Sequence, residues 1–145
     1  MTTVHRPSEG ERIGGPSAVT IKATAEDTNG SLYLGEASVE PGFSGPPLHR
    51  HRELHDMFYV LEGSLSVTVG DKTLELEAGS FACVPPGTPH TFANTSDQPV
   101  RFLNFNTPAG WENYMRDLGA LLSSGDATPE GSAGSPLATT SRSFE

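Results

Sequence analysis

The stretch PLHRHRELHDMFYVLEG, residues 47–63, decides how this chain is interpreted. It contains three of the five histidines, His49, His51 and His55, and it runs into an apolar segment that ends at Gly63. His49 and His51 are two residues apart, a spacing that points both side chains to the same face of a strand. Two imidazoles inside a barrel are costly unless a divalent metal uses their lone pairs, and neutral imidazole is a good ligand for Zn, Cu, Fe and Ni. The stretch therefore predicts a metal site.

A second stretch, GSFACVPPGTPHTFAN at residues 79–94, strengthens this prediction. His90 begins an expected strand directly after the Pro- and Gly-rich turn at residues 85–89. From this position it can face the first pair of histidines from across a barrel. His5 lies in a polar segment and is expected to be solvated.

The rest of the chain indicates an all-β fold. Its 145 residues suffice for one domain with one core, and 16 glycines and 12 prolines suit short strands joined by turns. Apolar and polar residues alternate in several segments, as in an antiparallel sandwich or barrel. These segments are residues 17–24, 31–40, 57–69, 72–78, 80–84, 90–94 and 100–106.

The flanking regions are organised differently. Residues 1–16 are polar and read as an arm that is flexible or ordered by a partner. Within 109–122, apolar residues recur at spacings of three and four, which predicts one C-terminal helix packed on the outside of the sheets. Residues 17–122 would thus form the barrel and its helix, and the Ser-, Gly- and Pro-rich residues 123–145 a mobile tail.

Composition argues against several partners. Lys and Arg number 9 and Asp and Glu 18, which gives a formal net charge of −9. Because such a surface repels phosphate and anionic lipid, we expect neither nucleic acid nor a membrane as a partner. One cysteine, Cys83, suits a reducing compartment, and no segment looks like a leader or a membrane span. These features favour a cytoplasmic protein.

The two histidine segments together resemble the paired motifs of the cupin superfamily. The second motif, G-x5-P-x-G-x2-H-x3-N, is met at every fixed position of residues 79–94. The first, G-x5-H-x-H-x3-4-E-x6-G, is met by His49, His51 and Gly63, while Gly42 lies one residue further from His49 than usual. The resemblance implies a double-stranded β-helix, a small barrel of the jelly-roll type.

The chain departs from the first motif at the position of the glutamate, where it has no glutamate. Counting forward across three residues from the second histidine gives His55, and counting back across six from the closing glycine gives Asp56. We favour His49, His51, His55 and His90 as the ligands. The alternative is that Asp56 replaces His55, or that Asp56 orients a ligand imidazole by accepting its hydrogen bond.

Four neutral imidazoles would leave the 2+ charge of the ion uncompensated, which makes it a strong Lewis acid. The chain also resembles the small cupin-fold aromatic polyketide cyclases of the resistomycin type. This resemblance implies a bound Zn²⁺, with Fe²⁺ and Ni²⁺ as alternatives, and an aldol-type cyclisation of a poly-β-keto intermediate in antibiotic biosynthesis. A bound hydroxide, Tyr59 or Asp56 would then move protons.

An apolar, aromatic lining would suit a hydrophobic, polyketide-like substrate. Its candidates are Tyr33, Phe43, Met57, Tyr59, Phe81, Phe92, Phe102 and Phe105. Whether the substrate arrives on an acyl carrier protein stays open. We expect a homodimer, because small cupins pair sheets or exchange an N-terminal strand. Two other functions compete with the cyclase, a metal-dependent dioxygenase for a flavonol or diketone and a non-enzymatic cupin that binds a small molecule.

Overall fold

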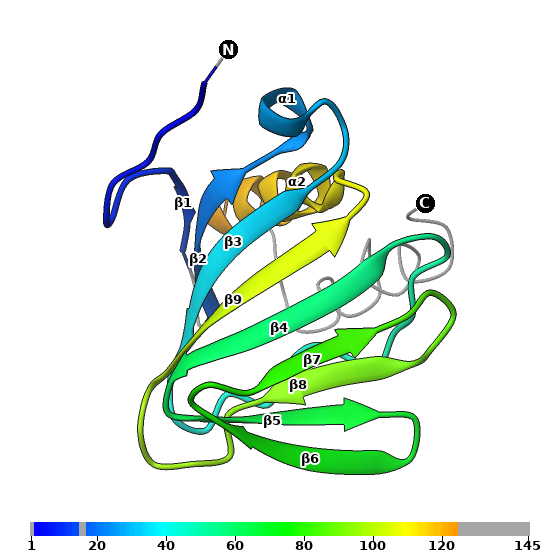
Figure 1. Cartoon of the computed structure of the whole chain (residues 1–145). Helices are drawn as coiled ribbons and strands as arrows, with labels where there is room; N and C mark the ends of the chain where they lie inside the picture. Colours follow the sequence, from blue (N-terminus) through cyan, green and yellow to red (C-terminus); the bar gives the residue numbers. More distant parts are fainter. Residues whose placement is uncertain (1, 15–16, 125–145) are drawn as a thin grey trace.

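The computed structural model describes residues 2–14 and 17–124, which form two antiparallel sheets and two helices (Figure 1). The larger sheet has six strands in the order β1-β2-β3-β9-β4-β7, and the smaller has three in the order β6-β5-β8. The elements are β1 (Glu11–Ile13), β2 (Ser17–Ala23), α1 (Ala25–Thr28), β3 (Tyr33–Val39), β4 (His55–Glu62), β5 (Ser64–Val69), β6 (Lys72–Glu77), β7 (Phe81–Val84), β8 (His90–Ala93), β9 (Val100–Thr107) and α2 (Trp111–Ser124).

The core lies between the two sheets. Alternate residues of the strands point inward, so that Val39, Phe58 and Phe102 of the larger sheet meet Leu65 and Val67 of the smaller. All five are buried. The expected all-β jelly-roll barrel with a C-terminal helix is confirmed.

One expected strand is divided in two. The alternation at residues 57–69 continues across Gly63, but the structure ends β4 at Glu62 and begins β5 at Ser64. Gly63 has φ of 82°, and a Cβ there would lie 2.7 Å from the carbonyl oxygen of Pro99. Glycine therefore permits both the turn and the close approach, which a pattern of apolar residues does not reveal.

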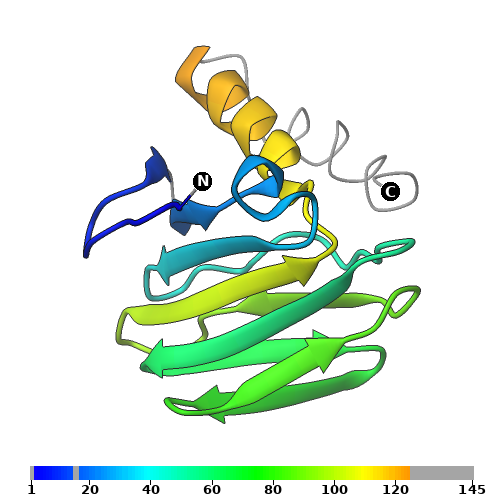
Figure 2. The same cartoon turned by 45° about the horizontal axis from the view of Figure 1, so that its top comes forward.

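The N-terminal arm is partly ordered by the chain itself. Strand β1 pairs with β2, and the side chain of Ile13 joins the core. The short helix α1 was not predicted. The expected C-terminal helix is present as α2, which lies beside α1 at the end of the barrel (Figure 2).

Buried Glu112 of α2 joins the two helices, because its carboxylate accepts hydrogen bonds from the backbone N–H groups of Ala25, at 2.7 Å, and Gly110, at 2.8 Å. Most of the expected tail, residues 125–145, lies outside the described residues. Among the described residues, no helix has the length and apolar character needed to cross a membrane.

Candidate metal centre

The two histidine segments meet beside each other, next to strand β8 of the smaller sheet. His49 and His51 lie in the connection between β3 and β4, whereas His90 is the first residue of β8. His49 and His90 pair through their backbones, with N···O distances of 3.0 and 2.7 Å. The N–H of Gly87, in the turn before β8, donates to the carbonyl of His51 at 2.7 Å. These bonds fix the two segments against each other.

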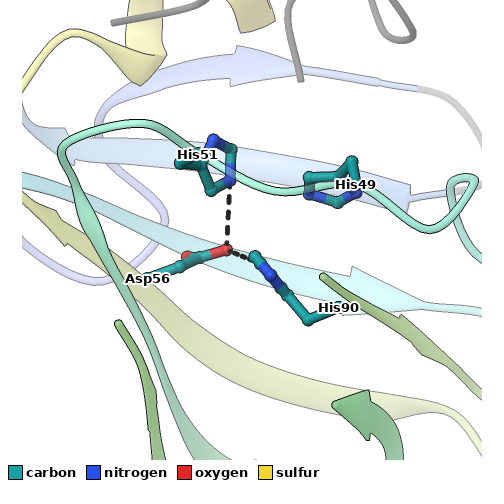
Figure 3. Close-up of side chains that lie close together, drawn as sticks. All are labelled: His49, His51, Asp56 and His90. Carbon is teal, nitrogen blue, oxygen red and sulfur yellow. Dashed lines mark hydrogen bonds and ion pairs between the residues drawn. The ribbon is translucent and has the colours of Figure 1, made fainter. Parts of the chain in front are cut away.

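Four side chains converge there (Figure 3). His49, His51, His90 and Asp56, the second residue of β4, each offer one ligand atom, and these atoms all lie within 4.8 Å of one another. All four residues are buried. Three imidazoles and a carboxylate aimed at a common point are the donor set of a transition-metal site.

Backbone carbonyls set the orientation of two rings. Nδ1 of His49 lies 2.9 Å from the carbonyl oxygen of Pro47, and Nδ1 of His90 lies 2.9 Å from that of Thr88. Because a carbonyl only accepts, each Nδ1 carries the hydrogen and each Nε2 is left with the lone pair for an ion. A hydrogen bond at the other ring nitrogen is the usual way in which proteins orient a ligand histidine.

The contact between His90 and Asp56 shows that the site favours a cation. Nε2 of His90 lies 2.8 Å from Oδ2 of Asp56, and Nε2 of His51 lies 3.6 Å from the same oxygen. Without an ion, a proton must lie between Nε2 of His90 and the carboxylate. Because this contact lowers the pKa of Asp56 and raises that of His90, the proton is on the ring, which is then an imidazolium since its Nδ1 is protonated as well. A metal would take the place of this proton.

The pKa values follow from the same contacts. Burial lowers the pKa of His49 to about 4, so this ring is neutral at pH 7. Burial opposes the charged forms of Asp56 and His90 as well, but the contacts of Asp56 with His51 and His90, and of His90 with Asp56, outweigh it. The pKa of Asp56 is therefore lowered and that of His90 is raised. The residues fit a divalent transition metal, and the carboxylate would offset one unit of its charge.

The structure corrects the favoured ligand set, because Asp56 and not His55 joins the three other histidines. Neighbouring residues of β4 point to opposite faces, and the burial of this strand alternates accordingly. His55 is exposed on the outer face of the sheet, and so is Tyr59, at 39% exposure. Tyr59 therefore cannot move protons at this centre.

The residues expected to line the barrel also divide between the core and the outer face of the larger sheet. Tyr33, Phe43, Phe92 and Phe102 belong to the core or pack against it. Met57, Tyr59, Phe81 and Phe105 lie on the outer face of β4, β7 and β9, where Tyr59 pairs with Phe81 and Met57 with Phe105. Beneath the metal centre, Phe58 contacts His90, with ring centroids 6.4 Å apart.

Three residues of the site were not singled out from the sequence for a role there. The amides of Asn104 and Asn106, on β9, each donate to Oδ1 of Asp56 at 2.7 Å. The signal was present as two asparagines with strand spacing in a segment that is otherwise mostly apolar. Trp111, expected to be part of the apolar stripe of the helix, packs against the core as expected and also lies against the ligands. Its ring is parallel to that of His49 within 10° at 6.5 Å and edge-on to that of His51 at 5.2 Å.

Comparison with known families agrees with this geometry. Residues 35–106, which contain all four converging side chains, match the family described as the cupin domain. The chain is a cupin. Among curated proteins it is similar to quercetin 2,3-dioxygenase from Bacillus subtilis (strain 168), with 36% identity over 95 residues. That match covers 63% of this cupin but only 27% of the dioxygenase.

Solved structures give the same fold. The polyketide cyclase RemF from Streptomyces resistomycificus is 28% identical to this cupin with a TM-score of 0.61, and the match covers 74% of this chain and 79% of RemF. A predicted oxalate decarboxylase from Thermotoga maritima is 22% identical with a TM-score of 0.65. That match covers 74% of this chain and 99% of the Thermotoga protein, and it supports the fold alone.

Proposed function

We propose that this cupin is a metal-dependent dioxygenase that acts on a flavonol or a related enolised diketone. The observation that carries this proposal is Asp56, which supplies a carboxylate where an all-histidine centre would place a fourth imidazole. Histidines together with a carboxylate are typical of non-haem iron oxygenases. The similarity to quercetin 2,3-dioxygenase supports the same reaction class.

Different residues of the chain would bind the ion, contact the substrate and exclude water. His49, His51, Asp56 and His90 would hold the ion, which supplies Lewis acidity and redox chemistry when bound. Trp111 presents a flat aromatic surface beside His49, which suits a planar aromatic substrate. Phe58, Phe92 and Phe102 pack against one another behind the centre. They exclude water from the ligands on that side.

Oxygen consumption tests this proposal. The metal-free protein would be loaded with Fe²⁺, Ni²⁺ or Zn²⁺, and oxygen uptake measured with quercetin and with acetylacetone as substrates. We expect uptake that depends on substrate and on Fe²⁺ or Ni²⁺ and that is lost in His90→Ala. A protein that binds these ions but consumes no oxygen with either substrate would contradict the proposal.

The second candidate is a polyketide cyclase, favoured by the 28% identity to RemF. In this case the four residues would hold an ion that supplies Lewis acidity to a carbonyl of a poly-β-keto chain. The oxidation state of the ion would not change, so Zn²⁺ would support the reaction. The two functions share a hydrophobic substrate with neighbouring oxygens. They are distinguished because ring closure by loss of water needs no oxygen and proceeds under anaerobic conditions.

We also propose that the cupin is a homodimer formed through the outer face of β4, β7 and β9. Phe81, at 55% exposure, and Tyr59 lie side by side on this face, and Phe81 contacts Phe105 with ring centroids 6.1 Å apart. Exposed aromatic clusters are typical of protein interfaces. A face with few charges also lets two chains of net charge −9 approach each other.

A further inference from the structure

Asp56 reaches the metal centre with one oxygen only, because its other oxygen is held from behind. Oδ2 faces the histidines, at 2.8 Å from Nε2 of His90. Oδ1 accepts two hydrogen bonds, one from the side-chain amide of Asn104 and one from that of Asn106, both at 2.7 Å. The carboxylate is thus fixed at both ends before any ion binds.

The register of the strands produces this arrangement. Asn106 on β9 lies directly opposite Asp56 on β4, and Asn104 lies opposite Phe58, two residues further along the strand. Both asparagines therefore share the inward face with Asp56 and flank it on one side. The histidines approach from the connection before β4 and from β8, so the carboxylate lies between two amides and three imidazoles.

The orientation of the Asn106 amide is determined by its partner. A carboxylate only accepts, so the NH₂ group and not the oxygen must face Asp56. Oδ1 of Asn106 then points elsewhere, and it is buried with no hydrogen bond to any described residue. A buried amide oxygen without a partner is unfavourable. Asn106 is 1% exposed, so water does not satisfy this oxygen. The unfavourable oxygen indicates that the NH₂ group of the same amide is needed for its hydrogen bond to Asp56.

We propose that Asn104 and Asn106 are positioning residues that hold Asp56 in the rotamer that binds the metal with a single oxygen. The proposal rests on the metal centre described above. Asn104 also donates to the backbone carbonyl of Met57, at 3.0 Å, and so contributes to the sheet. Within the described part of the chain, the side chain of Asn106 donates to Asp56 alone, which makes Asn106 the cleaner position for a test.

The test compares metal binding in Asn106→Ala and Asn106→Leu with wild type, by titration of the metal-free protein with Co²⁺ and Zn²⁺. The leucine variant refills most of the space, so a loss shared by both variants cannot come from a cavity. We expect the dissociation constant to rise about tenfold or more in both, the scale on which groups behind the ligands act. The visible spectrum of bound Co²⁺ should change as well, because the carboxylate is no longer fixed.

A matched control is Asn94→Ala. Asn94 is as deeply buried as Asn106, but its amide donates to the carbonyls of Gln98 and Val39 and not to a residue of the metal centre. This variant should lower the melting temperature and leave the affinity of the folded protein for Co²⁺ within about twofold. It separates a general loss of stability from a loss of positioning.

A double-mutant cycle tests whether Asn106 affects metal binding through Asp56. If Asn106 acts through Asp56, then adding Asn106→Ala to Asp56→Ala should weaken Co²⁺ binding no further. Wild-type affinity and an unchanged Co²⁺ spectrum in both Asn106 variants would overturn the proposal, and so would fully additive losses in the cycle. Failure of the dioxygenase proposal would appear instead as metal binding without oxygen uptake. A wild-type protein that binds no ion would overturn both.

Discussion

The two faces of strand β4 carry residues with different roles. The sequence alone could not assign each candidate site residue to the inner or the outer face. Asp56, Phe58 and Val60 point inward, where the first reaches the metal centre and the other two join the core. His55 and Tyr59 point outward and are exposed. Adjacent residues of one strand thus have unrelated roles. Chemical similarity to the other ligands favoured His55, but the alternation of the strand decides for Asp56.

The largest difference between the faces should appear in stability. Phe58 is 1% exposed and contacts Phe92 and Phe102, so Phe58→Ala should lower the free energy of unfolding by about 3–5 kcal/mol. His55→Ala, three residues earlier and exposed, should change it by less than about 0.5 kcal/mol. Urea unfolding of the metal-free variants measures both. Equal effects of the two substitutions would mean that the faces of β4 are wrongly assigned.

The next largest effect concerns the histidines that meet Asp56 on the inner side. His90→Ala and His51→Ala each remove a ligand, so the metal affinity should fall by at least about tenfold. His5→Ala, an exposed histidine of the arm, is the matched control and should retain the wild-type affinity. Elemental analysis after dialysis gives the result. Full occupancy in both ligand variants would remove the metal centre.

The affinity for the metal should also depend on pH in a defined direction. An ion competes with protons for the ligands, so the affinity falls as the pH falls. Although burial opposes it, the contact with Asp56 raises the pKa of His90 above its usual 6.5, so the loss should begin above pH 6.5. It should amount to about tenfold per pH unit for this one proton and steepen near pH 4, where His49 is protonated.

Isothermal titration with Zn²⁺ between pH 4 and pH 8 measures this dependence. An affinity that is constant across this range would show that the ion does not displace the proton held between His90 and Asp56.

The smallest effect on the metal centre should come from the outer face. Phe81→Glu places a charge in the proposed dimer interface and should therefore dissociate the dimer. The mass of the particle should fall from twice the 15.3 kDa of one chain to 15.3 kDa. The metal content should not change, because Phe81 points away from the ligands. Light scattering at micromolar concentration is the measurement. A wild-type particle of 15.3 kDa would contradict the dimer itself.

Much of the fold could be predicted from alternation. The segments expected as strands correspond to β2 through β9, and the predicted helix corresponds to α2. What the pattern could not show was the division at Gly63, since an apolar alternation continues across it and only φ and the nearby Pro99 carbonyl distinguish the turn. The pairing of β1 with β2 was also missed, because a strand of three residues has too short a pattern.

The candidate site was predictable where spacing alone was sufficient. His49, His51 and His90 were identified from two motifs, and the structure brings them together. The choice between His55 and Asp56 depended on where β4 begins, which motif spacing leaves uncertain by one residue. Asn104, Asn106 and Trp111 act through contacts between segments that are 48 to 62 residues apart in the chain, and periodicity within one segment cannot reveal such contacts.

The metal content of Asp56→Ala and His55→Ala, purified side by side, tests the central claim most directly. Asp56 lies among the buried ligands, so Asp56→Ala should lose the ion by at least about tenfold in affinity. His55 is exposed on the opposite face, so His55→Ala should retain the wild-type occupancy. The reverse outcome, with the ion lost from His55→Ala and kept in Asp56→Ala, would contradict the account. It would also return the centre to four histidines and remove the main reason for preferring a dioxygenase to a cyclase.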